Sequence, residues 1–304
     1  MFVKSDPTSI EKIARLIFGL SLPMNVISLI LFGDYLDLVK HTWADTYHKV
    51  GMDMITDEGK QKIFEATDRI FVTRDILNNL LGDNGHPTDL EVSSDDIQGW
   101  EFQVRDWMMD SWYDTYITYL RRTYGANDGS IFQLDLIDTF RRIEKRTLLA
   151  SSNGHLVKPE FYFMLSGKRN THLGNSDMRQ ALQDTFSGLT RVRNTGITNG
   201  DDCIGLTHRG VDTGMEALGF KVTDSEYQEK DCVRFSSQYF VRYQDRICRF
   251  PESLAKSAFK ILSDPRDDNM TLGLTLHVSE HPGREKFMAF RHFARKLDEA
   301  IVLE

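Results

Sequence analysis

The sequence predicts an α+β fold, in which antiparallel strands and helices come from different stretches of the chain. Short apolar runs on both sides of Gly200, at Ile197 and from Cys203 to Leu206, indicate a strand, a tight turn and a second strand. Apolar residues at three- and four-residue spacing from Val104 to Leu120 indicate a long amphipathic helix. A chain of 304 residues with 40% hydrophobic and 27% charged residues has room for two or three globular subdomains.

The cysteines and histidines argue against two common kinds of site. Cys203, Cys232 and Cys248 are odd in number and show no CxxC spacing, so neither a disulfide framework nor a zinc site is expected, and a reducing compartment is favoured. His277 and His281 have the four-residue spacing of metal ligands on a helix, but no acidic or thiol residue lies at a spacing that would complete a site.

The formal net charge of −8 is unusual for a protein that binds nucleic acid, which usually carries a basic surface. Basic residues are nevertheless concentrated in three stretches, each of which is also consistent with a solvated helix face. These stretches contain Arg121, Arg122, Arg141, Arg142, Lys145 and Arg146, then Lys168, Arg169, Arg179, Arg191 and Arg193, then Arg284, Lys286, Arg291, Arg295 and Lys296.

The stretch from Leu16 to Gly33 lacks charged residues and approaches the length of a membrane span. Gly19, Ser21 and Pro23 interrupt it, so a short strand, a turn and a buried helix are expected instead. The N-terminus also lacks the features of a signal peptide. No transmembrane segment is therefore predicted.

Further elements follow in order along the chain. Residues 35–88 look mainly helical and end in the loop 82–87; a strand runs from Leu90 to Asp95 or Asp96, and the aromatic residues of the 104–120 helix are expected in the core. The second half is predicted to contain a loop at 151–154, an apolar stretch at 161–165, a loop at 166–175, a helix at 178–189, a helix at 211–218 capped by Gly219, a strand at 220–223, a hairpin at 233–241 and mixed helix from Asp245 onward.

The turn Gly200-Asp201-Asp202 presents two adjacent carboxylates at the tip of the predicted hairpin. Carboxylates are good ligands for Mg²⁺ or Mn²⁺, which prefer oxygen. A third acid comes from the predicted strand that ends near Asp95 and Asp96. Since a strand alternates its faces, only one of these two can point to the turn, and Asp96 is favoured because Glu101 follows it five residues later.

Three separated pieces now stand in order: Asp96 with Glu101, Ser166-Gly167 with Thr171 and Asn175, and Gly200-Asp201-Asp202. In order and spacing they resemble motifs A, B and C of the palm of viral RNA-dependent RNA polymerases. The local sequence is similar to the sobemovirus, luteovirus and barnavirus-like enzymes of positive-strand RNA viruses. Further similar segments are Phe2–Pro7 with Lys12 and Arg15–Ile17 (motif F), Ser94–Val104 (motif A), Leu218–Asp224 (motif D) and Phe235–Phe240 (motif E).

The resemblance implies a right-hand polymerase palm, an antiparallel sheet with helices, with partial fingers and a small helical thumb. The implied organisation is 1–34 fingertip motif F and start of the fingers, 35–88 fingers, 89–125 palm with motif A, 126–160 fingers insertion, 161–244 palm with motifs B to E, and 245–304 thumb-like.

It also implies the roles of the site residues in RNA synthesis by two-metal nucleotidyl transfer. Asp96 and Asp201 would bridge two Mg²⁺ or Mn²⁺ ions with Asp202 in support, and Lys221, or the nearby Lys230, would be the general acid for pyrophosphate. The nucleotide would be bound by Lys4, Lys12 and Arg15 on the triphosphate, Ser166, Gly167 and Gly200 at the mobile loop and turn, and Glu101, Thr171 and Asn175 on the ribose. The family usually has Asp where this chain has Glu101, which shifts the carboxylate by about a bond length.

The implied partners are an RNA template and product strand, nucleoside triphosphates and other viral replicase proteins, in a replication complex in the host cytoplasm. Because Met1 falls at the edge of motif F, the sequence is expected to be a piece of a larger polyprotein or frameshift product. Two alternatives stay open: a catalytically weak RNA-binding fragment, and a reverse transcriptase, against which the Ser-Gly, Thr and Asn set and the Gly-Asp-Asp turn both count.

Overall fold

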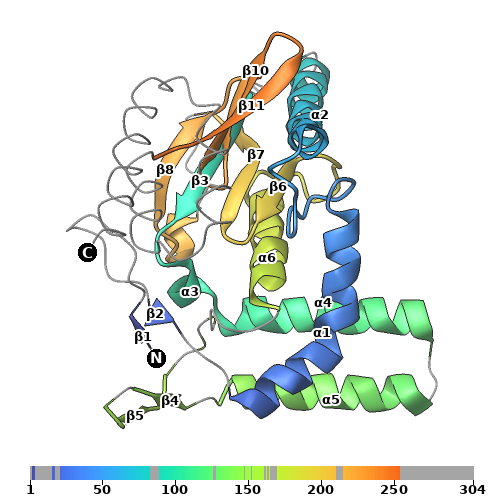
Figure 1. Ribbon diagram of the computed structural model, residues 1–304, viewed down its shortest axis with the longest axis vertical. Coiled ribbons are helices and arrows are strands. Elements are labelled where there is room, and N and C mark those ends of the chain that lie inside the picture. Colours follow the sequence, from blue (N-terminus) through green and yellow to red (C-terminus); the bar gives the residue numbers. More distant parts are fainter. Residues whose placement is uncertain are drawn as a thin grey trace, which may run out of the picture.

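The computed structural model confirms an α+β architecture of antiparallel sheets and helices (Figure 1). The structure describes residues 2–3, 16–17, 21–82, 89–125, 128–146, 148–151, 153–160, 162, 164, 170–209 and 215–253. The predictions for 83–88, 161, 163, 165–169, 211–214 and 254–304 therefore lie outside the described residues. These include the His277 and His281 pair and all of the thumb-like segment after residue 253.

The main sheet has four strands in the order β6-β7-β3-β8, every neighbouring pair antiparallel. Its members are β3 (Leu90–Ile97), β6 (Gly196–Asn199), β7 (Asp202–His208) and β8 (Val222–Tyr227). The strand expected from Leu90 and the strand, turn and strand expected around Gly200 are thus confirmed. Because β3 and β6 end where β7 and β8 begin, four chain segments meet at one end of this sheet.

A second sheet is built from β9 (Cys232–Phe235), β10 (Gln238–Tyr243) and β11 (Arg246–Pro251) in the order β11-β10-β9. The hairpin expected at 233–241 is confirmed. The mixed helix expected from Asp245 onward is wrong for 246–251, which pairs with β10 along its length. In β11, residues Ile247, Arg249 and Pro251 are buried and alternate with more exposed ones, which is the period of a strand.

Helices α2 (Asp57–Gly82) and α6 (Thr171–Phe186) pack on the main sheet. Leu90, Val92, Ile204 and Leu206 form a core with residues of α2 and of the second sheet. Helix α6 begins at Thr171, so the loop expected to extend to Asn175 is wrong for its last five residues. Thr171 and Asn175 consequently lie on the first two turns of a helix that covers the sheet.

A helical layer lies beyond α6 at the lower side of Figure 1, made of α1 (Leu22–Thr42), α4 (Asp106–Tyr124) and α5 (Asp128–Glu144). The predicted amphipathic helix is α4, and its aromatic residues Trp112 and Tyr116 are buried against Phe32 of α1. Trp107 departs from that expectation, with 54% of its surface exposed.

Helix α1 differs from the buried helix expected there. Pro23 lies in its first turn, where the missing N–H costs nothing, and therefore does not interrupt it. Leu22 and Ile30 are largely exposed. By length and composition α1 is the one helix among the described residues that could cross a membrane. In its apolar 18-residue stretch, 28% of the residues are buried within the protein.

The remaining elements are short. They are β1 (Phe2–Val3), β2 (Leu16–Ile17), α3 (Trp100–Gln103), β4 (Leu149–Ala150), β5 (Leu156–Val157) and the 3-10 helix η1 (Glu216–Leu218). Gly219 follows η1 with φ of 88° and its backbone N–H donates to Glu216 O, so the capping role expected of it is confirmed at the end of η1. The strand expected at 220–223 is β8, which begins two residues later.

Candidate functional site: carboxylates at one end of the main sheet

The Gly200-Asp201 turn connects β6 to β7 as a two-residue hairpin loop, with Asn199 paired to Asp202. Gly200 has φ of 71°, whereas Asp201 does not have positive φ. Glycine at the first central position is the pattern of a type II′ turn, whose twist matches the flanking strands. The turn therefore requires Gly200 and places Asp201 at the tip.

Asp96 reaches the same end of the sheet from β3. Asp95 pairs with Cys203 of β7, and one further step of this register brings Asp96 opposite Asp202. On the other edge of β3, Asp96 pairs with Thr223 of β8. The three predicted acids therefore come from two adjacent strands and the turn between β6 and β7.

Lys221 also lies at this end. It immediately precedes β8, and its carbonyl accepts a 2.9 Å hydrogen bond from the backbone N–H of Gln98, two residues after Asp96. The side chain of Lys221 is exposed. The backbone thus places the predicted general acid near the predicted metal ligands.

The neighbour of Asp96 points elsewhere. Asp95 forms an ion pair of 2.7 Å with Arg179 of α6, whose side chain is fully buried. Burial alone would lower the pKa of Arg179. The carboxylate of Asp95 outweighs this effect, with smaller contributions from Cys203 and Asp201, so the pKa of Arg179 is raised. Since side chains alternate along a strand, Asp96 leaves β3 on the face opposite α6. The sequence did not single out Arg179 as a residue of the site.

Helix α6 also holds the Gly200-Asp201 turn in place by hydrogen bonds to Ser176. The backbone N–H of Gly200 donates a 2.8 Å hydrogen bond to Ser176 Oγ, and Thr198 Oγ1 donates to Ser176 O at 3.1 Å. A Cβ on Gly200 would lie 3.2 Å from His172 Cδ2. The contact with α6 therefore leaves little space for any side chain at position 200.

The residues predicted to bind the ribose lie on two elements. Glu101 is on α3, where its carbonyl accepts a 2.8 Å hydrogen bond from Met164 N. Thr171 is the first residue of α6, and Asn175 lies one turn later on the same helix. Asn175 Oδ1 is buried and makes no hydrogen bond with any described residue. A buried amide oxygen in this condition is an acceptor that a ligand hydroxyl could satisfy.

A buried polar cluster that the sequence did not predict lies next on α6, around Asp177. Its carboxylate accepts hydrogen bonds from Trp112 Nε1 at 2.7 Å and Tyr47 Oη at 3.2 Å, and lies 3.0 Å from His48 Nε2. Burial raises the pKa of Asp177 to about 7, against the effect of both hydrogen bonds, and burial lowers the pKa of His48 to about 4. The cluster connects α6 to α4 and to the segment 47–49.

That segment extends the sheet beside the turn. Lys49 N donates to Thr198 O at 2.7 Å, and Thr198 N donates to Tyr47 O at 2.9 Å, so 47–49 pairs with the outer edge of β6. The Lys49 ammonium is buried and donates to the carbonyl oxygens of Trp43 and Thr46. This edge of the sheet is therefore covered by backbone instead of being open.

Five predicted nucleotide-binding residues, Lys4, Lys12, Arg15, Ser166 and Gly167, lie outside the described residues. The structure brings together Asp96, Asp201, Asp202, Gly200 and Lys221 by backbone placement. Their side chains do not close around a shared point: within the described part of the chain, no group of three or more His, Cys, Asp or Glu side chains is gathered tightly enough to hold a metal ion. The donor chemistry suits Mg²⁺ or Mn²⁺, so the metal stays a prediction.

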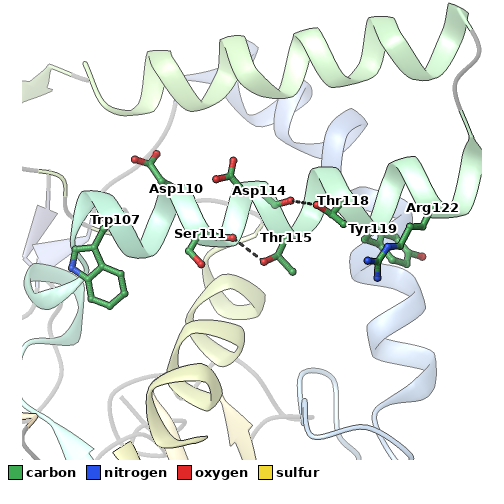
Figure 2. Close-up of a pocket in the computed structure, with 8 residues that line it drawn as sticks. All are labelled: Trp107, Asp110, Ser111, Asp114, Thr115, Thr118, Tyr119 and Arg122. Carbon is green, nitrogen blue, oxygen red and sulfur yellow. Dashed lines mark hydrogen bonds between the residues drawn. The ribbon is translucent and has the colours of Figure 1, made fainter. Parts of the chain in front are cut away.

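A hollow of about 670 Å³ lies elsewhere, along α4. Figure 2 shows its lining of Trp107, Asp110, Ser111, Asp114, Thr115, Thr118, Tyr119 and Arg122. The hydroxyls of Thr115 and Thr118 donate to carbonyls of the preceding turn of the same helix. None of the predicted site residues lines this hollow.

Comparison with solved structures finds a similar fold in a viral RNA-dependent RNA polymerase. A crystal structure of the RNA-dependent RNA polymerase of a human picobirnavirus, in an insertion-loop deletion mutant, is similar with a TM-score of 0.64 and 12% sequence identity. The similarity covers 91% of this chain and 53% of that polymerase, so the chain spans about half its length. No family model and no curated protein matches the sequence.

Proposed function

We propose that the chain catalyses template-directed RNA synthesis by nucleotidyl transfer. One observation carries the proposal: on a polymerase-like fold, the turn with Asp201, the start of β7 with Asp202 and the end of β3 with Asp96 meet at one end of an antiparallel sheet. Carboxylates that separate chain segments bring to one end of a sheet are suitable ligands for catalytic divalent ions.

In this proposal Asp96 and Asp201 hold Mg²⁺ or Mn²⁺ ions and Asp202 supports them. The ions would activate the attacking 3′-oxygen and stabilise charge at the α-phosphate. Lys221, exposed immediately before β8, would donate a proton to the departing pyrophosphate. Closure of the three carboxylates around the ions is a rearrangement that the substrate would induce.

Recognition of the ribose is assigned to Asn175, with Thr171 and Glu101. The support is the buried Oδ1 of Asn175, which has no hydrogen-bond partner among the described residues. A 2′-hydroxyl donating to this oxygen would satisfy it, and a deoxyribose would leave it unpaired. Discrimination against dNTPs follows from this assignment.

The finer assignments belong to the same proposal. They are the division into palm, partial fingers and thumb, the relation to sobemovirus, luteovirus and barnavirus-like enzymes, binding of RNA, nucleoside triphosphates and other replicase proteins, and action in a cytoplasmic replication complex. They rest on the motif sequences and on the fold class.

The test is primer extension on an RNA template with Mg²⁺ or Mn²⁺, comparing the wild type with Asp201→Ala. Asp37→Ala on α1, an exposed acid, is the matched control. We expect rNMP addition by the wild type and the control, little dNMP addition, and none by Asp201→Ala. Equal incorporation by wild type and Asp201→Ala would contradict the metal role.

A catalytically weak RNA-binding fragment is the second candidate, because the chain spans about half of the similar polymerase. It predicts RNA binding without incorporation, and incorporation only when a longer piece of the parent reading frame is expressed. Preferential use of dNTPs on RNA would instead favour a reverse transcriptase.

A further inference from the structure

We propose that Arg179 is a positioning residue, whose buried ion pair with Asp95 determines that Asp96 is the acid of β3 presented beside Asp201 and Asp202. The proposal rests on the proposed function for the importance of Asp96. Its geometrical content, which acid faces which side of the sheet, is independent of catalysis.

Two adjacent acids make the end of β3 ambiguous. A change of one residue in register, or a local rotation of the strand, would turn Asp95 to the turn and Asp96 away, because side chains alternate. Both side chains carry the same charge and the same ligand chemistry. The distinction must therefore come from what lies on the other face of the sheet.

Arg179 supplies that distinction. Its side chain has no exposed surface, and the side chain of Asp95 is only 9% exposed, so the 2.7 Å contact lies away from water. In such surroundings an unpaired carboxylate or guanidinium is strongly disfavoured, so breaking the pair by removing one partner is costly. One acid of β3 is thus needed inside, and only its neighbour remains for the other face.

Helix α6 contacts both the Gly200-Asp201 turn and strand β3, which carry the predicted metal ligands. Ser176, Arg179 and Gln183 are three and four residues apart and share one face of α6. Ser176 accepts from the N–H of Gly200, Arg179 binds Asp95, and Gln183 donates to Leu206 O at 2.7 Å. Through this face, α6 sets the position of the turn, of β3 and of β7 relative to one another.

Carboxyl footprinting tests the proposal directly. The protein is treated briefly with a water-soluble carbodiimide and glycine ethyl ester without metal or RNA, and labelling of Asp95 and Asp96 is measured by tandem mass spectrometry. In the wild type, Asp96 should react and Asp95 should be protected. In Arg179→Met, the unpaired Asp95 should turn outward and react, and labelling of Asp96 should fall several-fold.

Two further variants complete the test. Asp95→Asn leaves the buried Arg179 without a counter-charge, so Asp96 should turn toward it and lose label. Arg141→Met breaks an ion pair with Asp110 between α4 and α5, which is more exposed, with 17% and 33% of the two side chains accessible, and it should leave both labels unchanged.

The proposal is overturned if folded Arg179→Met retains wild-type labelling, or if Arg141→Met produces the same change. If circular dichroism shows that Arg179→Met does not fold, Asp95→Asn decides by the same criterion. Since labelling needs no turnover, it stays readable even if the wild type fails to extend a primer. In an active protein, Arg179→Met should raise the Mg²⁺ concentration that gives half-maximal activity. Arg179→Lys, which keeps the positive charge, should return this concentration toward the wild-type value.

Discussion

Asn199 Nδ2 donates a 2.8 Å hydrogen bond to Ser236 Oγ, and this bond connects the main sheet to the second sheet. Asn199 is the last residue of β6 and directly precedes the Gly200-Asp201 turn. Ser236 is the first of two turn residues between β9 and β10. The position of the predicted metal-binding turn therefore depends on a hairpin that follows it in the chain.

Removing this bond should weaken both the fold and the turn. We expect Asn199→Ala and Ser236→Ala each to lower the free energy of unfolding by about 1 kcal/mol and the double variant to lose less than their sum. Chemical denaturation and primer extension measure the two effects. Ser237→Ala, at the exposed neighbouring position, is the control, and fully additive losses would show that the two side chains do not interact.

The turn between β9 and β10 can be improved by one substitution. Ser236 and Ser237 have φ of 52° and 58°, the left-handed conformation that both central residues of a type I′ turn require. Glycine adopts it without the cost of about 1 kcal/mol that another residue bears. Ser237→Gly should therefore raise the urea midpoint, and an unchanged or lower midpoint would speak against this turn geometry.

Gly200→Ala should distort the turn that carries the predicted metal ligands Asp201 and Asp202. The residue has φ of 71°, and the new Cβ would lie 3.2 Å from the His172 ring. We expect a loss of about 1–2 kcal/mol in stability and a larger proportional loss of activity, because Asp201 and Asp202 would move together. Gly154→Ala provides the comparison, since its φ of 86° is similar but no atom lies within 4 Å. Equal activity of both variants would contradict the expectation.

Lys49 gives the protein a defined dependence on pH. Burial, and then the charge of Arg69, lower the pKa of Lys49 to about 7 from 10.5, with Asp45 opposing. The unfolded chain then binds more protons than the folded protein between these values, so stability should rise as pH increases from about 7 toward 10. Relative to Lys49→Met, the wild type should gain on the order of a few kcal/mol over this interval. If the difference in unfolding free energy between the wild type and Lys49→Met did not change between about pH 7 and 10, the lowered pKa of Lys49 would be contradicted.

Much of this fold could be predicted where the sequence has a clear period. The spacing of Met108, Trp112, Tyr116 and Leu120 predicted α4, and the residues flanking Gly200 predicted the β6–β7 hairpin. The prediction included Trp107 in this stripe, but Trp107 is exposed because it lies on the opposite side of α4 from the other four residues. Strand β11 was missed because its buried face includes Arg249, which breaks the apolar alternation expected of a strand.

The site was predictable only in part, for a different reason. Motif spacing selected Asp96, Asp201 and Asp202, and the register brings all three to one end of the sheet. Arg179 looked like one of a group of surface cations, and its burial depends on a tertiary contact with Asp95 that no local pattern encodes. The one available signal was its position four residues after Asn175, on the same helix face.

The most direct test of the central claim is NMP incorporation on an RNA primer–template by Asp96→Asn, Asp201→Asn and the double variant. If the two acids form one metal centre, each single substitution should abolish nearly all incorporation and the double variant should lose little more, since groups acting as a unit are not additive. Wild-type incorporation by Asp96→Asn, or independent and additive losses, would contradict the shared centre.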